Sequence, residues 1–420
     1  MSRSIKHSKN GAKGETPAAD HTEGSATPSV TSAAEFQTEY VATFTFAHAV
    51  HDTYSAFMAP LLPALIAKLS LSMTQAGALE LARTIPAILQ PLIGHLGDRV
   101  NLRYLIILAP AITGTMMSLL GIAPSYGVLF TLTMAAGLGA AFLHAVAPAM
   151  AGRFSGAKLG WGMGIWMVGG SLGFTIGPVI AVAALELVGL EGTPWLMIAG
   201  WIASVILYLR LRDTSTVYQA AQRRGSLRDG LHAFRPLMAP LVAISVVRAL
   251  PTAALMTFLP TLLIQEGESM WFAGISLTVL TGAGWIGALL GGAMSDRLGR
   301  HVLLFLSMSS AAALILVFLA VDGWMRLPIL LLVGTTGPAA RAVFMAFVQE
   351  SCPDNRALAT GMYLAVTFIT ASAAAVVVGA LGDLLGLRLA FAISAIILLL
   401  GSPLVRLLPG TAADAVPPAN

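Results

Sequence analysis

The sequence predicts an all-α membrane protein with twelve transmembrane helices, arranged as two pseudo-symmetric bundles of six. Three observations support this prediction: few charged residues, long apolar segments, and a motif repeated in both halves of the chain. Charged residues make up 10% of the 420 residues and hydrophobic residues 56%, whereas a soluble domain carries about 25% charged residues. Lipid rather than water is therefore expected to surround most of the chain.

Twelve apolar segments are long enough to cross a bilayer as helices, which takes roughly 20 residues each. They cover residues 40–68, 74–97, 103–122, 126–153, 160–186, 194–212, 236–265, 270–294, 301–321, 327–350, 357–382 and 387–408. Lipid offers the backbone no hydrogen-bond partner, so we expect helices rather than strands of an open sheet.

The distribution of Lys and Arg predicts the orientation in the membrane. With the N-terminus inside, thirteen of these residues fall in cytoplasmic loops and three, Lys68, Arg326 and Arg388, in external loops. Basic residues concentrate on the cytoplasmic side of membrane proteins. Both termini are therefore predicted to be cytoplasmic and the chain to lie in the inner (cytoplasmic) membrane. The loops account for most of the basic charge, so it indicates no nucleic-acid partner.

Polar segments divide the chain into its predicted parts. Residues 1–38 are rich in Ser, Thr, Ala and Gly and cannot bury enough apolar surface to fold, which predicts a disordered cytoplasmic tail. The longest internal polar stretch predicts a cytoplasmic linker at residues 213–235. This linker would separate an N-terminal bundle at 39–212 from a C-terminal bundle at 236–408. Residues 409–420 are expected to form a second cytoplasmic tail.

The two halves share a motif of the form Gly-x-x-x-Asp-Arg. Its residues are Gly94, Asp98 and Arg99 in the first half and Gly292, Asp296 and Arg297 in the second. The two copies lie 198 residues apart, and Pro63 and Pro260 lie in similar segments at an offset of 197. A nearly constant offset indicates duplication of a six-helix unit, an arrangement that places a transport site near the membrane midplane between the halves.

This motif, between the second and third predicted spans, resembles the loop signature of the major facilitator superfamily. Two copies in register make the resemblance specific, whereas a single copy could be a plain helix-ending turn. The resemblance implies a two-bundle fold and transport by alternating access. It also implies that Asp98 helps to hold one conformation through charge and helix-end contacts.

A closer resemblance, over residues 45–365, is to the fosmidomycin resistance family. The residues that carry it in the first half are His48 to Tyr54 with Pro60 to Pro63, Leu71 to Gly77 with Leu89 to Gly94, and Gly137-Leu-Gly with His144. In the second half they are Phe258 to Pro260, Gln349, Glu350, Pro353 and Gly361. Members of that family are drug efflux pumps that run on protons, so the resemblance implies drug efflux and resistance.

Ionisable residues inside predicted spans are rare in membrane proteins and usually mark a functional site. Here they are His48, His51, Asp52, Glu80, Arg83, His144, Arg248 and Arg341. An offset of 197 relates His51 to Arg248 and His144 to Arg341. Equivalent positions of the two halves therefore carry groups that can be cationic.

We expect Arg248 and Arg341 to bind an anionic group of the substrate, such as a carboxylate or a phosphonate, through their planar donors. Arg83 is either a third contact or the partner of Glu80, which lies one helical turn earlier on the same face. The predicted substrate-binding residues are Arg83, Arg248, Arg341, His51, His144 and Tyr54. The alternative is that each Arg pairs with a carboxylate and stabilises the bundle.

Asp52, His48 and Glu80 are the predicted proton-coupling residues. His48 and Asp52 are four residues apart and share a helix face. Histidine changes charge near neutral pH, which suits a proton-coupled carrier. Alternatively, His48 makes an interhelical hydrogen bond and Asp52 is a fixed counter-charge to an Arg.

Glycines in the fifth predicted span indicate close helix packing. Gly169, Gly173 and Gly177 recur every four residues, and Pro178 allows a bend. The segment resembles the glycine-rich antiporter motif of drug–proton exchangers, so Gly173, Gly177 and Pro178 are grouped with the conformational motif.

No metal and no cofactor is predicted. A single cysteine, Cys352, excludes a disulfide framework and a multi-cysteine metal site. Met163 and Met167 could suggest a copper carrier, but methionine is also common in apolar cores.

Taken together, these features predict a secondary active transporter that exports a small organic anion or amphiphilic drug by proton antiport, as a monomer. Uptake of an anionic metabolite is the alternative. A non-transporting membrane sensor would need a large output domain, which the short tail does not supply. A membrane enzyme would need a nucleophile–base or metal constellation near one interface, and the sequence shows none.

Overall fold

A computed structural model describes residues 35–97, 100–214, 227–351 and 356–409. All regular elements in these ranges are helices. Nine segments of the described residues are long and apolar enough to cross a membrane. The predicted all-α membrane fold is thereby confirmed.

The first half contains eight α-helices and the second half seven, counted within the described residues. The first set is α1 (Thr38–Ser55), α2 (Met58–Leu69), α3 (Met73–Thr84), α4 (Gln90–Gly97), α5 (Arg103–Ser118), α6 (Tyr126–Phe154), α7 (Leu159–Gly192) and α8 (Met197–Leu211). The second set is α9 (Leu227–Ala253), α10 (Leu259–Gln265), α11 (Met270–Leu298), α12 (Arg300–Ala320), α13 (Arg326–Ser351), α14 (Arg356–Leu385) and α15 (Leu387–Gly401).

Several predicted spans are interrupted or joined. The first is divided into α1 and α2 at Ala56–Phe57, and the second into α3 and α4 by the 3₁₀-helix Ile85–Leu89. That turn contains Pro86, which has no N–H for an α-helical bond. The fifth and sixth predicted spans fall in one apolar segment, Trp161–Leu211, which kinks at Gly189 with φ of 70°. The number of twelve spans therefore stays a prediction.

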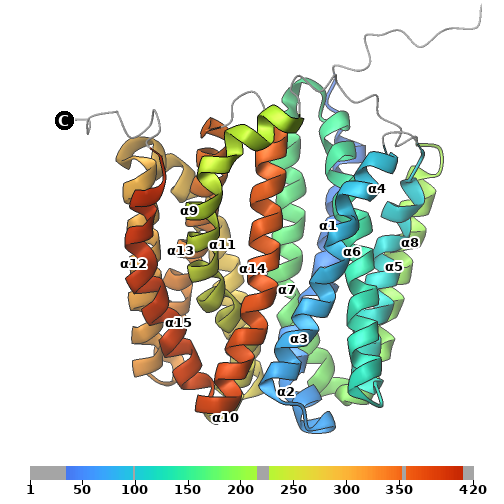
Figure 1. Ribbon diagram of the computed structural model, residues 1–420. Coiled ribbons are helices and arrows are strands. Elements are labelled where there is room, and N and C mark those ends of the chain that lie inside the picture. The colour runs from blue at the N-terminus through green and yellow to red at the C-terminus, as the bar shows by residue number, and fades with distance from the viewer. Residues whose placement is uncertain (1–34, 98–99, 215–226, 352–355, 410–420) are drawn as a thin grey trace, which may run out of the picture.

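The two sets of helices lie side by side, with α1–α6 and α8 on the right of Figure 1 and α9–α15 mainly on the left. Within the first set α1 packs on α7 and α5 on α6 and α8; within the second α11 packs on α13 and α9 on α14. α9 begins at Leu227, inside the predicted linker at 213–235. The other domain boundaries stay predictions.

The halves are joined through α2 with α10, α3 with α14, and α7 with α11. α2 and α10 lie at the lower end of the molecule in Figure 1, opposite the C-terminus. In the described residues α14 packs extensively on α3 and at most marginally on α4. The halves thus meet at the end where α3 begins, which the charge distribution predicts to be external, and separate toward the end that carries α4.

Candidate functional site

A cluster of three histidines surrounds Asp52 inside the first half. Asp52 is only 4% exposed, and its Oδ2 lies 3.1 Å from His48 Nε2. Its Oδ1 lies 3.8 Å from His51 Nε2 and 4.0 Å from His144 Nε2. Helix α1 places His48 and Asp52 on one face because four residues make about one turn, and α6 supplies His144. We call His48, Asp52 and His144 the His–Asp–His cluster.

The hydrogen bonds of the His48 and His144 rings show which ring nitrogen of each carries a hydrogen. His48 Nδ1 lies 2.9 Å from the carbonyl oxygen of Trp166, and His144 Nδ1 lies 2.9 Å from that of Ala140. A carbonyl oxygen only accepts, so each Nδ1 carries a hydrogen. In a neutral ring the Nε2 atom is then an acceptor, and it faces a carboxylate that also only accepts. The cluster consequently needs a shared cation, such as a proton on Nε2 or on Asp52.

The glycine face of α7 makes room for this cluster. A Cβ at Gly170 would overlap the ring of His48 and lie 2.7 Å from Asp52 Oδ2. One turn further, a Cβ at Gly173 would lie 2.7 Å from the backbone nitrogen of Thr53. The ring of His48 also stacks on Trp166, with centroids 3.9 Å apart. Helix α7 therefore approaches α1 closely, as the glycine spacing predicts.

The cluster has a geometry that could hold a metal ion as well as a proton. Its three candidate donor atoms all lie within 4.8 Å of one another. Two imidazole nitrogens and one carboxylate oxygen are donors that Zn²⁺ accepts. The sequence predicts no metal, so a Zn²⁺ ion stands as the alternative to a proton at this cluster.

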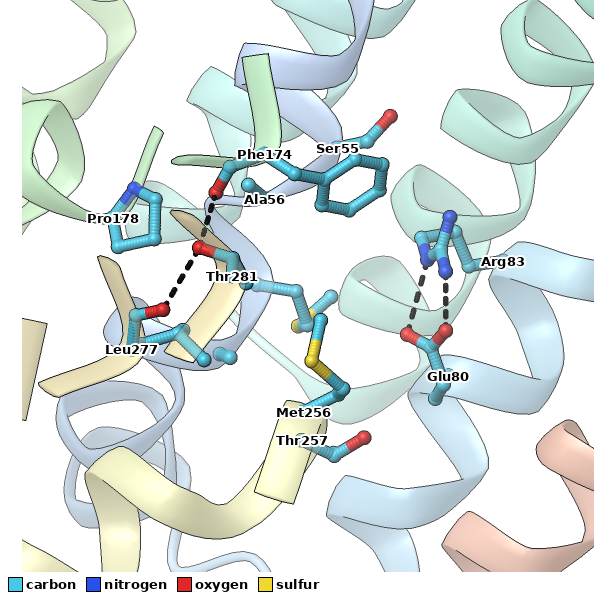
Figure 2. Close-up of a pocket in the computed structure, with 12 residues that line it drawn as sticks. Ser55, Ala56, Glu80, Arg83, Phe174, Pro178, Met256, Thr257, Leu277 and Thr281 are labelled. Carbon is cyan, nitrogen blue, oxygen red and sulfur yellow. Dashed lines mark hydrogen bonds and ion pairs between the residues drawn. The ribbon is translucent and has the colours of Figure 1, made fainter. Parts of the chain in front are cut away.

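A small pocket lies between the halves (Figure 2). Its volume is about 70 Å³, which holds a few water molecules but not a drug-sized ligand, since pockets for such ligands measure about 300–1,000 Å³. Its lining residues are Ser55, Ala56, Met58, Ala59, Glu80, Arg83, Phe174, Pro178, Met256, Thr257, Leu277 and Thr281. Pro178 of the predicted glycine-rich motif is thus a pocket residue.

Arg83 and Glu80 form an ion pair at the wall of this pocket (Figure 2). Arg83 Nε donates to Glu80 Oε2 at 3.0 Å, and Nη2 donates to Oε1. Of the two alternatives drawn from the sequence, the structure shows Arg83 paired with Glu80 rather than free for a substrate. Each group neutralises the other while the pair is intact.

Arg248 and Arg341 lie together in the second half, on α9 and α13. Arg248 Nη2 donates to the carbonyl oxygen of Gly337 at 3.3 Å, one helical turn before Arg341. Its guanidinium lies over the ring of Phe344, 5.0 Å from the centroid, and Arg341 is close enough to interact with its charge. Neither arginine forms an ion pair with a carboxylate among the residues that the structure describes.

Tyr363 is a candidate residue that the sequence reasoning missed. It is 1% exposed, stacks on Phe344 with centroids 6.1 Å apart, and lies close enough to Arg248 to interact with it. Its hydroxyl has no hydrogen-bond partner in the described part of the chain. The Arg248 guanidinium interacts with the oxygen of this hydroxyl, but a guanidinium has only donors and cannot accept the hydroxyl proton. The weak signal in the sequence was a tyrosine inside an apolar span.

Two predicted substrate residues lie away from any open surface. The hydroxyl of Tyr54 donates to the carbonyl oxygen of Leu196 at 2.5 Å, and its ring packs beside Gly114 and Gly200. Tyr54 therefore joins α1 to the adjacent helices and does not face the His–Asp–His cluster. His51 is 0% exposed and cannot contact a substrate in this conformation.

The repeated motif is described only in part. Asp98 and Arg99 lie outside the described residues, and so does the side chain of Asp296. Gly94 lies in α4 and Gly292 in α11, and Arg297 is exposed near the end of α11. The conformational role of these residues stays a prediction.

The chain belongs to the Major Facilitator Superfamily, whose family model matches residues 44–356 and 286–419. It is a multi-pass membrane protein and a secondary transporter of small molecules, not an enzyme. It is similar to the "Fosmidomycin resistance protein" of Escherichia coli (strain K12), at 23% identity over 84% of this chain and 89% of that protein. It is also similar to the "Uncharacterized MFS-type transporter YfnC" of Bacillus subtilis (strain 168), at 26% identity over 81% of this chain and 85% of that protein. The predicted resemblance to the fosmidomycin resistance family is confirmed.

Solved structures support the same fold. A bacterial homologue of the human lysosomal transporter Spinster, inward-facing and unoccupied, matches with a TM-score of 0.73 and 17% identity, over 90% of this chain and 98% of that one. The nucleoside transporter NupG matches with a TM-score of 0.67 and 17% identity, over 87% of this chain and 98% of that one. At this identity the likeness concerns the fold alone.

Proposed function

We propose that this transporter exports a small organic anion or an amphiphilic anionic drug in exchange for protons. It would act as a monomer in the inner (cytoplasmic) membrane, with both termini in the cytoplasm. The observation that carries the proposal is the pair Arg248 and Arg341, which has no carboxylate partner in the described residues. The name of the E. coli relative, a fosmidomycin resistance protein, supports export of a drug.

The unpaired arginines favour an anionic substrate. Placing an arginine in a membrane span costs about 2.5–3.5 kcal/mol on insertion scales, so an anion bound beside these two arginines would offset part of that cost. The contact of Arg248 with Gly337 and Phe344 holds its planar donors in place. An oxyanion bound there would accept from both guanidinium groups, and the free hydroxyl of Tyr363 would donate a further bond.

The His–Asp–His cluster favours protons as the coupling ion. Its Nε2 atoms and its carboxylate all present lone pairs to one another, so binding one proton removes a repulsion inside the first half. A protonated cluster has no buried net negative charge, which lowers the cost of closing helices around it. Proton and anion would thus bind in different halves and be coupled through the movement of one half against the other.

The anion proposal is tested in proteoliposomes, with fosmidomycin as the probe and an internal pH dye as the readout. Arg248→Ala and Arg341→Ala are each expected to lower the probe-driven proton flux by about tenfold or more, because a charged hydrogen bond of roughly 1.5–3 kcal/mol is lost. Arg210→Ala, which breaks an exposed ion pair with Glu39, is the matched control and should keep the flux. Normal transport by both site variants would overturn the anion site.

The proton proposal is tested with Asp52→Asn and His48→Gln. Both variants are expected to keep exchange of the labelled probe between two sides at equal pH and to lose accumulation driven by a pH gradient. His301→Gln serves as the control, since His301 lies at the start of α12 in the other half, with its Nε2 3.0 Å from the carbonyl oxygen of Leu408. Unchanged gradient-driven accumulation would contradict the proposal, and so would accumulation that depends on added Zn²⁺ instead of on the pH gradient. The side to which the probe accumulates separates export from the alternative of uptake.

A further inference from the structure

Asp383, near the end of α14, binds the beginning of α3 in the opposite half. Its Oδ1 accepts a hydrogen bond from Met73 N at 2.6 Å. Its Oδ2 accepts from Thr74 N at 2.9 Å and from Thr74 Oγ1 at 2.5 Å. Residues about 310 positions apart in the sequence are therefore joined by three hydrogen bonds on one carboxylate.

The N-terminus of α3 is a favourable place for a carboxylate. The first N–H groups of a helix have no partner within the helix, and the helix dipole is positive there. Ser72 already accepts from Gln75 N at 3.1 Å, and Gln75 Oε1 accepts from Ser72 N at 3.0 Å. The capping box leaves the N–H groups of Met73 and Thr74 without a partner in α3, and Asp383 accepts hydrogen bonds from both.

The two helices touch backbone to backbone directly beside these bonds. A Cβ at Gly77 of α3 would lie 2.7 Å from the carbonyl carbon of Ala375. A Cβ at Gly379 of α14 would lie 2.7 Å from the carbonyl carbon of Met73. Asp383 thus adds hydrogen bonds to a close helix–helix contact between the halves, at the end where they meet.

We propose that Asp383 acts as a latch, by which we mean a contact that holds the external ends of α3 and α14 together. Its three bonds hold the halves together at the predicted external end while they are apart at the other end, and they must break in every transport cycle. Asp98 lies at the other, predicted cytoplasmic, end of the span that contains α3. There the family resemblance implies a helix-end contact that would stabilise the other conformation. The latch follows from alternating access alone and does not depend on what the transporter carries.

The test measures distances between spin labels in the full-length protein in lipid nanodiscs, without any substrate. Cys352 is replaced by serine, and label pairs are introduced at exposed positions. The external pair is Glu191→Cys with Gln265→Cys, and the cytoplasmic pair is Val100→Cys with Leu298→Cys. Each pair has one label in each half, so the two pairs report opening and closing at the two ends.

Asp383→Ala is expected to raise the ratio of externally open to externally closed molecules by about threefold to tenfold, the effect of an exposed charged contact at a helix N-terminus. The external distances should lengthen and the cytoplasmic distances shorten together. Thr74→Ala, which removes one of the three bonds, should give a smaller shift in the same direction. Asp322→Asn, an exposed acid at the same end that pairs within its own half, should give none.

Unchanged distances in both Asp383→Ala and Asp383→Asn would overturn the latch. Lengthening of the external pair without shortening of the cytoplasmic pair would also overturn it, since that result means local fraying of α3. Size-exclusion profiles show which variants are folded. If Asp383→Ala does not fold, the distances in Thr74→Ala test the proposal instead.

Discussion

Replacing Gly170 by alanine tests whether close packing of α7 on α1 shapes the His–Asp–His cluster. A Cβ at this position would overlap the ring of His48 and lie 2.7 Å from Asp52 Oδ2, whereas ordinary contacts begin at 3.4 Å. The ring cannot retreat freely, because its Nδ1 is bonded to the carbonyl oxygen of Trp166 and its face is stacked on that residue. The helices must therefore separate by several tenths of an ångström or the bond must break. Overpacking of this kind costs about 1–3 kcal/mol.

Two measurements follow this change, and Gly164→Ala is the control. Gly164 lies on the same helix, and a Cβ there meets nothing within 4 Å. Because 1 kcal/mol shifts Tm by about 2–4 °C in domains of 150–250 residues and by less in longer chains, Gly170→Ala should lower Tm by a few degrees in a tryptophan-fluorescence melt. It should also weaken accumulation driven by a pH gradient. If Gly170→Ala and Gly164→Ala behave alike in both assays, close packing is not what shapes the cluster.

Three further substitutions separate structural from transport roles. Tyr54→Phe loses the bond to Leu196. It should lower the free energy of unfolding by about 1 kcal/mol in a denaturation series and leave the affinity for the probe unchanged; a large loss of affinity would instead indicate that Tyr54 contacts the substrate. Tyr363→Phe should do the reverse, raising the KM for the anionic probe several-fold with little loss of Tm, because no acceptor in the described residues takes its hydroxyl proton; an unchanged KM would exclude it. Arg326→Ala removes a buried partner that lies 2.6 Å from Glu266 Oε2, while Arg388 stays bonded to Glu266 Oε1. It should cost about 1–3 kcal/mol, seen as a drop in Tm; a normal melt would contradict that estimate.

Much of the fold was predictable because lipid imposes simple constraints. Long apolar segments have to be helices, and the repeated motif predicts two related halves. The interruptions at Ala56 and at Pro86 were harder to predict, because a proline such as Pro63 in α2 or Pro110 in α5 can also lie inside a continuous helix. Local sequence does not decide between a kink and a break, since neighbouring helices can satisfy the freed backbone groups.

Pairings within one helix were predictable, whereas contacts between helices were not, and the roles of the candidate site residues stay predictions. Helical spacing correctly joined His48 to Asp52 and offered Glu80 as a partner of Arg83. Spacing along one helix does not tell which side faces a neighbouring helix, so Tyr54 was placed with the substrate residues although it points toward Leu196. The contact of Asp383 with the start of α3 depends on two segments about 310 residues apart, and no local pattern predicts such a meeting.

The His–Asp–His cluster and its supports lie in α1, α6 and α7, while Arg248, Arg341 and Tyr363 lie in α9, α13 and α14. At positions that the predicted repeat makes equivalent, the two halves thus carry different residues, as His144 and Arg341 illustrate. Such separation makes the protein modular for evolution and for engineering. Because we propose that protons bind in the first half and the anion in the second, a chimera that keeps the first six predicted spans and takes the last six from a relative should keep the proton coupling of this protein and transport the substrate of the relative.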